Sequence, residues 1–593
     1  MAVSWAHVLT WETGPLDSIA SDLLEASKGL REAYESGDTA VWSVRSQGEA
    51  VTTMQATTIC NLASLDRALT NINGALMAIE AARDGVGSIM AYVNEAKAFA
   101  SLHGCTINPD GSVSSVKQGM LAVTRLEDNV RAILSKANQV DTTLAEALAS
   151  INTDRYTDGD RGSDKVVGIP DVPQPNWSPS QNAAWWNSLP EERKKFLIDH
   201  CPDDIRHLDG LPAAARDQAN RRALDGYVDA NGKEHQGALK EAKRAVEEAQ
   251  LAYDIADKKQ ANNKTDGYVA AKKGDAQIKL ERAKEAYEDL KAIREQTAND
   301  VRASKGLAPA YLLDFNYDND YHRTTAIVSS GNPDTATHVS TLVPGIGTNV
   351  RGDLAKYVAA NDRLRAQTAH AGADPNNVAT ISYLGYVAPK NDGLNNIQAA
   401  DIGYANRAAP VLARFEEGLR ANAEANHHKF TNTLVTHSYG STTGGKAAAL
   451  MAPGTVDRLI LTGSPGGGVQ SIDEYNVPRE HVYESSIPEG DAVQGIGPDA
   501  YYGKNPRHLE GITHLSGDAT DAKDYWHPLP DIDDPQAEVT NRLSHAIDNH
   551  MLYFEDGTRT SQDFANIIAG GNPTTDEEWA AIKAARAKEN NGH

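Results

Sequence analysis

Apolar residues recur at three- and four-residue spacing between residues 16 and 100, as one face of a helix requires. The spacing resumes after a polar turn at Asn108-Pro-Asp-Gly111 and continues from about residue 116 to residue 150. The members of the two series are Leu62, Leu65, Leu69, Ile72 and Leu76, then Val123, Leu126, Val130 and Leu134. The pattern predicts an all-α region over residues 1–153, folded as a helical bundle or a long hairpin.

Residues 154–183 interrupt the helical pattern with glycines and with Pro170, Pro173, Pro175 and Pro179. Proline removes a backbone donor and breaks helices, so this segment has the composition of a linker. After it, Ser188-Leu-Pro-Glu191 has the spacing of a capping box with a proline near the first turn. We therefore expect a second helical module over residues 184–304.

Within this module, two segments rich in Lys and Glu carry apolar residues alternately three and four apart, which is typical of a coiled-coil seam. A polar turn at residues 262–267 separates them. The seam residues are Leu239, Ala242, Val246, Ala249, Tyr253 and Ala256, then Leu280, Ala283, Tyr287 and Leu290. The pattern predicts an antiparallel coiled-coil hairpin over residues 237–296, which is either a solvated spacer or an arm that pairs with another chain.

From residue 305 to residue 593 the pattern changes to short β-rich runs that alternate with alanine-rich helical segments. Such alternation predicts a mainly parallel sheet with helices on both faces, an α/β domain. The expected strands are residues 338–343, 378–384, 431–436, 458–462 and 481–486, and the expected helices lie near residues 352–369, 397–426, 440–451 and 560–569.

Charge and composition exclude several classes of partner. The formal net charge of −24 would repel a phosphate backbone, so we expect no nucleic-acid partner. No run of 18 uncharged apolar residues occurs, and we expect no transmembrane helix. The first residues lack a basic start and an apolar segment, so no Sec-type signal peptide is predicted. The expected location is the cytoplasm, or the exterior through a route that needs no Sec signal.

The segment Asn432-Thr-Leu-Val-Thr-His-Ser438-Tyr-Gly-Ser441 joins a strand-like run to an alanine-rich helix through a serine and a glycine. This is the context of a nucleophile elbow, in which the serine lies on a tight turn after a central strand. We predict Ser438 as the nucleophile. The usual pattern is G-x-S-x-G, and Thr436 replaces its first glycine, so its branch must point away from the turn.

A serine nucleophile needs a histidine to remove its proton and a carboxylate to orient that histidine. In the α/β-hydrolase fold the chain order is serine, acid, histidine. The acidic loop after the strand at 481–486 supplies Asp491 as the predicted acid, with Glu489 as a second candidate. His550 is the predicted base, preferred over His545, which fits a short helix better.

Two backbone amides are expected to form the oxyanion hole. The amide of Tyr439 follows the nucleophile and opens a helix, where the helix terminus lends positive potential. The second arises in the loop Pro344-Gly-Ile-Gly-Thr348, which follows an early strand, and we assign it to Ile346. A plain glycine-rich turn between strand and helix is the alternative interpretation of this loop.

No cofactor or metal site is expected. His427-His428 lacks cysteine or carboxylate partners at ligand spacing, and the three cysteines form no C-x-x-C pair. The run Gly463-Ser-Pro-Gly-Gly-Gly468 lacks the pattern of a phosphate-binding loop, so we interpret it as a turn at the rim of the site.

Four short motifs together resemble an actinobacterial α/β-hydrolase family long regarded as a domain of unknown function. They are Pro344-Gly-Ile-Gly-Thr348, His437-Ser-Tyr-Gly-Ser441, Gly463-Ser-Pro-Gly466 and Pro488-Glu-Gly-Asp491. The family's histidine is followed by an aromatic pair, which His550-Met-Leu-Tyr-Phe554 matches with one extra residue. The resemblance covers about residues 305–570 and implies a serine hydrolase with a Ser-His-Asp triad.

Proteins of this kind often carry N-terminal helices that resemble the WxG hairpins exported by type VII secretion systems. Trp42 lies near the expected turn between helices, but Trp42-Ser-Val44 lacks the glycine. Tyr34-Glu-Ser-Gly-Asp38 matches a Y-x-x-x-D pattern before the turn rather than after the second helix. Type VII export and a helical protein partner for residues 1–153 are therefore expectations from resemblance.

Two functions remain open at this point. The first is an esterase- or lipase-like enzyme that cleaves a carboxylic ester, or a related acyl bond, of a small molecule or lipid. The second is a secretion-associated or interaction protein, in which the helical half acts and the hydrolase fold is a scaffold.

Overall fold

A computed structural model of the protein describes residues 3–43, 49–115, 120–152, 177–189, 191–263, 266–390, 402–495, 498–519, 521–523 and 535–590. The chain divides into two compact units. The first comprises Met1–Glu191 with Asp209–Leu211, and the second comprises Glu192–Leu208 with Pro212–His593. No helix among the described residues combines the length and the apolar character needed to cross a membrane.

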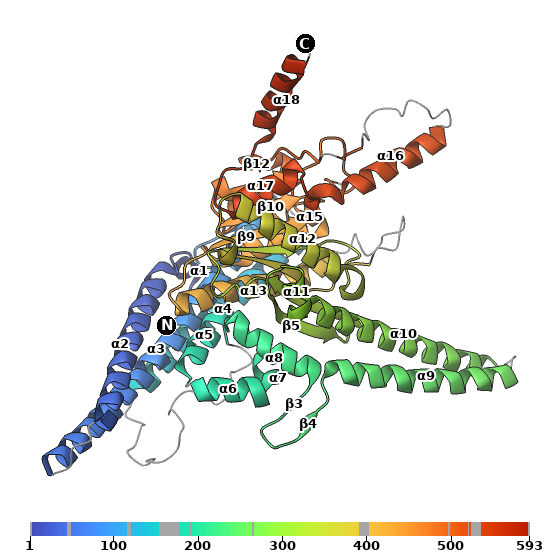
Figure 1. Ribbon diagram of the computed structural model, residues 1–593. Helices are drawn as coiled ribbons and strands as arrows, with labels where there is room; N and C mark the ends of the chain where they lie inside the picture. The colour runs from blue at the N-terminus through green and yellow to red at the C-terminus, as the bar shows by residue number, and fades with distance from the viewer. Residues whose placement is uncertain are drawn as a thin grey trace. The chain divides into compact units, whose positions relative to one another are not determined.

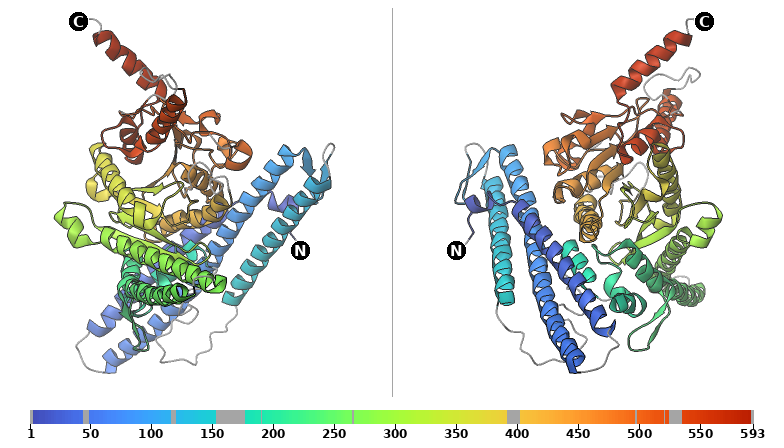
Figure 2. Two further views of the ribbon diagram at one scale, coloured as in Figure 1. Left: turned by 90° about the vertical axis from the view of Figure 1, so that its right-hand side faces the viewer. Right: turned by 60° about the vertical axis from the view of Figure 1, so that its left-hand side comes forward.

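The first unit is helical. Its elements are α1 (Trp5–Val8), α2 (Gly14–Ser43), α3 (Glu49–Leu102), the strands β1 (Cys105–Ile107) and β2 (Val113–Ser115), α4 (Met120–Asn152) and α5 (Pro179–Ser188). The three long helices α2, α3 and α4 lie side by side (Figure 2). Their core contains Leu126 and Val130 of the predicted apolar series, packed with Trp5 of α1 and Ile89 of α3. The prediction that this region is helical is confirmed.

The structure around the predicted Asn108 turn adds to the sequence-based description of this unit. The predicted turn at Asn108 forms, with the amide of Gly111 donating to the Asn108 carbonyl at 2.8 Å, and it joins the short strands β1 and β2, which were not predicted. Residues 44–48, where we expected the turn near Trp42, lie outside the described residues.

The predicted linker ends in a helix. Residues 153–176 lie outside the described residues, but α5 begins at Pro179, inside the predicted linker range. Ser178 caps this helix, since its hydroxyl accepts from the Gln181 amide while the Gln181 side chain accepts from the Ser178 amide. A proline at the first helical position has no donor to lose, so it starts this helix instead of breaking it.

The second unit is built on a mostly parallel sheet of eight strands (Figure 1). Their spatial order is β12-β11-β10-β9-β7-β8-β6-β5, in which only the β5–β6 and β6–β8 pairs are antiparallel. The bounds are β5 (Ala310–Asp318), β6 (Arg323–Ser330), β7 (His338–Val343), β8 (Val378–Leu384), β9 (Thr431–His437), β10 (Arg458–Thr462), β11 (Val482–Ser485) and β12 (Thr513–His514).

The helices of this unit cover both faces of the sheet. Their bounds are α6 (Glu191–His200), α7 (Pro202–Ile205), α8 (Ala213–Asp225), α9 (Ala238–Asn262), α10 (Gly267–Gln296), α11 (Asn299–Ser304), α12 (Val350–His370), α13 (Gly403–Ala425), α14 (Tyr439–Leu450), α15 (Asp499–Tyr502), α16 (Pro535–Asn549), α17 (Arg559–Ile568) and α18 (Asp576–Asn590). A two-stranded ribbon, β3 (Tyr227–Val228) with β4 (Glu234–His235), lies between α8 and α9.

Successive residues of a strand point to opposite faces of the sheet, so β9 contributes side chains to the hydrophobic core on each face. Leu434 packs with Leu412 of α13 on one face, whereas Val435 packs with Phe564 of α17 on the other. The chain therefore has the predicted fold class, an α/β-hydrolase domain with a mainly parallel sheet after a helical N-terminal region.

The predicted hairpin at residues 237–296 is present as α9 and α10, which run side by side (Figure 1). Lys273 of α10 bridges to Asp257 of α9 at 2.7 Å. Near its base the hairpin joins the sheet core, because Leu290 and Ile293 are buried with Leu312 of β5.

Candidate active site

Ser438 lies between β9 and α14, where the chain turns sharply from strand to helix. Its backbone has φ 59° and ψ −135°, a conformation that non-glycine residues rarely adopt. The Ser438 amide donates to the carbonyl of Thr462 on β10 at 2.9 Å, which anchors the turn to the sheet. Strained residues of this kind cluster at functional sites, and a nucleophile elbow needs such a turn.

Thr436 fits the elbow because a glycine of the following helix makes room for it. A Cβ at Gly444 would lie 2.4 Å from the Thr436 Cγ2, so the methyl group occupies the space that glycine leaves. The buried hydroxyl of Thr436 donates to the Ile460 carbonyl at 2.8 Å. Gly444 on the following helix therefore compensates for the replacement of the first glycine of G-x-S-x-G by Thr436.

The loop after β7 approaches the serine very closely. A Cβ at Gly345 would lie 2.4 Å from the Ser438 Cβ and 2.7 Å from its Oγ, so only glycine permits this approach. Ile346 follows directly, and Tyr439 opens α14, where first-turn amides point out of the helix N-terminus. The two residues predicted for the oxyanion hole thus lie on the two segments that flank Ser438.

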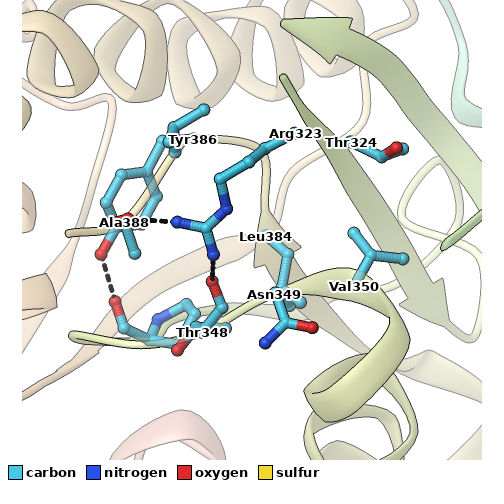
Figure 3. A pocket seen from close by; sticks show the side chains of 10 residues that line it. Arg323, Thr324, Thr348, Asn349, Val350, Leu384, Tyr386 and Ala388 are labelled. Carbon is cyan, nitrogen blue, oxygen red and sulfur yellow. Dashed lines mark hydrogen bonds between the residues drawn. The ribbon is translucent and has the colours of Figure 1, made fainter. Parts of the chain in front are cut away.

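Several hydrogen bonds hold this loop in place, and Figure 3 shows those around Arg323 and Tyr386. The Arg323 guanidinium donates to the Thr348 carbonyl at 2.8 Å and to the Ala388 carbonyl at 2.7 Å. The Tyr386 hydroxyl donates to the Pro344 carbonyl at 2.5 Å. A cavity of about 10 Å³, room for one water molecule at most, is lined by these clamping residues rather than by Ser438.

Asp491 and His550 are in direct contact. The Nδ1 of His550 lies 2.9 Å from Oδ1 and 3.0 Å from Oδ2 of Asp491. The carboxylate also accepts from the Val493 amide at 2.7 Å and from the Tyr553 hydroxyl at 2.7 Å. Burial alone would raise the pKa of Asp491, but the hydrogen bond and charge of His550, aided by these donors, lower it to about 2. The carboxylate is therefore ionised at neutral pH.

Gly463, at the carboxyl end of β10, lies against this pair. A Cβ there would be 2.8 Å from the Asp491 Oδ2 and 3.0 Å from the His550 Nδ1, and the residue has φ +52°. The turn at residues 463–468 thus contacts the site, as its interpretation as a rim turn anticipated. Its glycine is required both by backbone conformation and by space.

Ser438 follows β9, Asp491 follows β11, and His550 follows α16 and contacts Asp491. The other two candidates are placed differently, since Asp491 and not Glu489 bonds to His550, and His545 lies within α16. Within the described residues the Ser438 hydroxyl makes no hydrogen bond to His550. Catalytic hydrogen bonds of this kind are commonly long in unliganded sites and tighten with substrate.

A second histidine, His437, stands beside the predicted base and was not singled out from the sequence. Its Nε2 lies 2.8 Å from the main-chain carbonyl of His550, and the two rings stack with centroids 4.5 Å apart. Complete burial, reinforced by the charge of His550, lowers the pKa of His437 to about 3. Two signals in the sequence could have identified it, namely its place directly before the serine and its position as the first residue of the His437-Ser-Tyr-Gly-Ser441 motif.

A buried glutamate, Glu484, lies on β11, the strand that precedes the loop with Asp491. Glu484 on β11 accepts from the Ser486 hydroxyl at 2.6 Å and contacts the Nδ1 of His514 on β12 at 2.7 Å. The hydrogen bond to Glu484 raises the pKa of His514, and burial lowers it by a smaller amount, so the net shift is upward. Among the described residues, no group of three or more His, Cys, Asp or Glu side chains is arranged to hold a metal ion.

Comparison with known proteins agrees with this fold. Residues 320–499 match the model of a family described as alpha/beta hydrolase, a range that includes Gly345, Ser438 and Asp491. The chain is similar to two proteins of Mycobacterium tuberculosis, uncharacterized protein MT2140 of strain CDC 1551 / Oshkosh and uncharacterized protein Rv2079 of strain ATCC 25618 / H37Rv. Each is 27% identical over 454 residues, which cover 72% of this chain and 62% of the relative.

The matched segment thus spans less than two thirds of these relatives. No solved structure matches the chain significantly.

The close approach of Gly345 to the serine predicts the effect of one added methyl group. We expect Gly345→Ala to slow reaction with an activated ester by about 100-fold, because the loop must retreat from Ser438 by a fraction of an ångström or more. Gly274→Ala on α10 is the matched control, since a Cβ there meets no atom within 4 Å. Steady-state rates of the two variants decide this, and a wild-type rate for Gly345→Ala would contradict the assignment of the loop.

The Glu484–His514 contact predicts a pH dependence of stability. The pKa of His514 is raised in the folded state above its unfolded value of about 6.5, so the contact stabilises fully below that pH. This contribution is lost as the pH rises through the raised pKa. Thermal unfolding of wild type and His514→Gln, measured from about pH 5.5 to about pH 9, should show midpoints that differ most at the acidic end of this range. A gap that is constant across this range would refute the linkage.

Proposed function

We propose that the protein is a serine hydrolase that cleaves a carboxylic ester, or a related acyl bond, through Ser438, His550 and Asp491. The observation that carries the proposal is the contact of His550 with the ionised Asp491, together with the strained backbone of Ser438 at the end of β9. The hydrolase family match supports the reaction class, and the site geometry supports the assignment of roles.

In the proposed reaction, the Ser438 oxygen attacks the acyl carbonyl while His550 Nε2 takes its proton. Asp491 bonds to Nδ1, which fixes the tautomer that leaves Nε2 free to accept and stabilises the imidazolium that forms. The negative charge on the carbonyl oxygen is held by the amides of Ile346 and Tyr439.

Collapse of this intermediate breaks the bond to the alkoxy group, which leaves as an alcohol with the proton from His550. The acyl group stays on Ser438 as an ester. A water molecule then gives a proton to His550 and attacks this ester. In the second collapse the bond to the Ser438 oxygen breaks, His550 returns the proton to that oxygen, and the carboxylic acid is released.

The surroundings of the serine favour a substrate with an apolar portion. Tyr439 and Tyr502 are buried together with Ala405, and Ile346, Ile402 and Tyr404 pack partly buried against this cluster. Because Ile346 and Tyr439 flank the nucleophile, an acyl chain bound there would meet apolar side chains first. This supports a small-molecule or lipid ester as the substrate class.

The proposal is tested by labelling the full chain with a fluorophosphonate probe, which reacts with activated serines. We expect labelling of the wild type at Ser438, none in Ser438→Ala, and a reduction of at least about 1,000-fold in rate in His550→Ala. Ser441→Ala is the matched control because Ser441 is close in sequence to Ser438, is also buried, and donates to the Thr462 carbonyl.

Peptide mapping by mass spectrometry locates the adduct. A folded wild-type protein that takes no label, or a Ser438→Ala variant that is labelled as fast as wild type, would contradict the proposal. The first of these results would favour an interaction protein with a hydrolase scaffold, and residues 1–153 as the region to test for a helical partner.

A further inference from the structure

We infer that His437 is a positioning residue for the catalytic base, holding the main chain and the ring of His550 in register with the neighbouring serine. This inference rests on the proposed function and deepens it, because it assigns a role to a residue outside the triad. It begins from the one buried side chain that is covalently adjacent to Ser438 and also touches His550.

The first contact is a hydrogen bond to the backbone. The Nε2–H of His437 donates to the His550 carbonyl at 2.8 Å, and both residues are buried. Leaving a buried carbonyl without a donor is unfavourable, so we expect the segment to move to recover a partner. The bond thus ties the position of the base to the end of β9.

The second contact is between the rings. The imidazoles of His437 and His550 stack at 27° with centroids 4.5 Å apart, and Phe554 lies edge-on to His437 at 5.6 Å. With Asp491 bonded to Nδ1, this leaves the His550 ring confined on one face and at one edge. Confinement from two directions limits rotation of the ring about its side-chain bonds.

The chemistry suits a neutral donor at this place. During the reaction His550 becomes positively charged, and a charged neighbour at stacking distance would oppose that step. Burial keeps His437 neutral because its pKa is lowered to about 3. Histidine therefore supplies a hydrogen-bond donor and a flat ring without a competing charge.

The hydrogen bond also connects two residues that are far apart in the sequence. Ser438 and His550 are separated by more than a hundred residues in the chain, yet one hydrogen bond from the residue before the serine connects them. Misplacement of a catalytic group by about 1 Å can cost about 100-fold in rate. A small shift of His550 would thus be visible in turnover while substrate binding stays unchanged.

The test compares His437→Phe, which keeps a flat ring and removes the donor, with His437→Gln, which keeps a neutral N–H donor. We expect His437→Phe to lower kcat by about 10- to 100-fold with KM nearly unchanged, and His437→Gln to recover most of that loss. Fluorophosphonate labelling should slow in parallel with kcat.

The matched control is His428→Phe. His428 Nε2 also lies 2.7 Å from a main-chain carbonyl, that of Ala336, and its ring stacks on Phe430, but it precedes β9 and is remote from Ser438. Loss of this hydrogen bond should leave kcat and KM at wild-type values. A similar loss in both variants would mean that the effect is general destabilisation and would overturn the inference.

Backbone amide hydrogen exchange over residues 546–554, read by mass spectrometry, separates this inference from the proposed function. Exchange should be at least about tenfold faster in His437→Phe than in wild type and unchanged in His428→Phe. If the wild type takes no label, the proposed function fails, and exchange alone decides whether His437 anchors the segment. If the wild type is labelled but His437→Phe matches it in kcat and exchange, only the inference fails.

Discussion

The close approach of the loop after β7 to the turn between β9 and α14 is the constraint on which the site depends. The serine itself has φ 59°, and the glycines at 345 and 440 permit approaches that a single Cβ would prevent. A Cβ at Gly440 would lie 2.4 Å from the Val343 carbonyl oxygen, so β7 and α14 meet with no space for a side chain. Such strain persists only where the surrounding sheet fixes the backbone, and β9 lies buried between β7 and β10.

The electrostatics follow from this geometry. Asp491 lies in a buried position where burial opposes its charge, yet hydrogen bonds from His550, Tyr553 and the Val493 amide keep it ionised. The proposed mechanism gives the two neighbouring histidines opposite requirements, since His550 would accept a proton while His437 stays neutral. The same burial that costs Asp491 free energy keeps His437 neutral, so one desolvated cluster serves both needs.

Most of the fold and the candidate triad followed from local pattern. The parallel strands β7 to β11 are buried on both faces and form short apolar runs, which the sequence displays directly. The antiparallel β5 and β6 were missed, since β5 places Asp314 and Asn316 among its apolar residues. The choice of Asp491 over Glu489 depended on how one loop turns. The roles inferred for Arg323 and His437 depend on partners far away in the sequence, which no local spacing reveals.

The most direct test of the central claim is the pre-steady-state reaction of the full chain with a p-nitrophenyl ester, followed by acid quench and mass spectrometry of the Ser438 peptide. The account predicts a burst of about one p-nitrophenol per enzyme molecule when deacylation is slower than acylation, and an acyl mass on Ser438 in the quenched sample. Turnover that proceeds without an acyl group on that peptide, and that persists in Ser438→Ala, would contradict it.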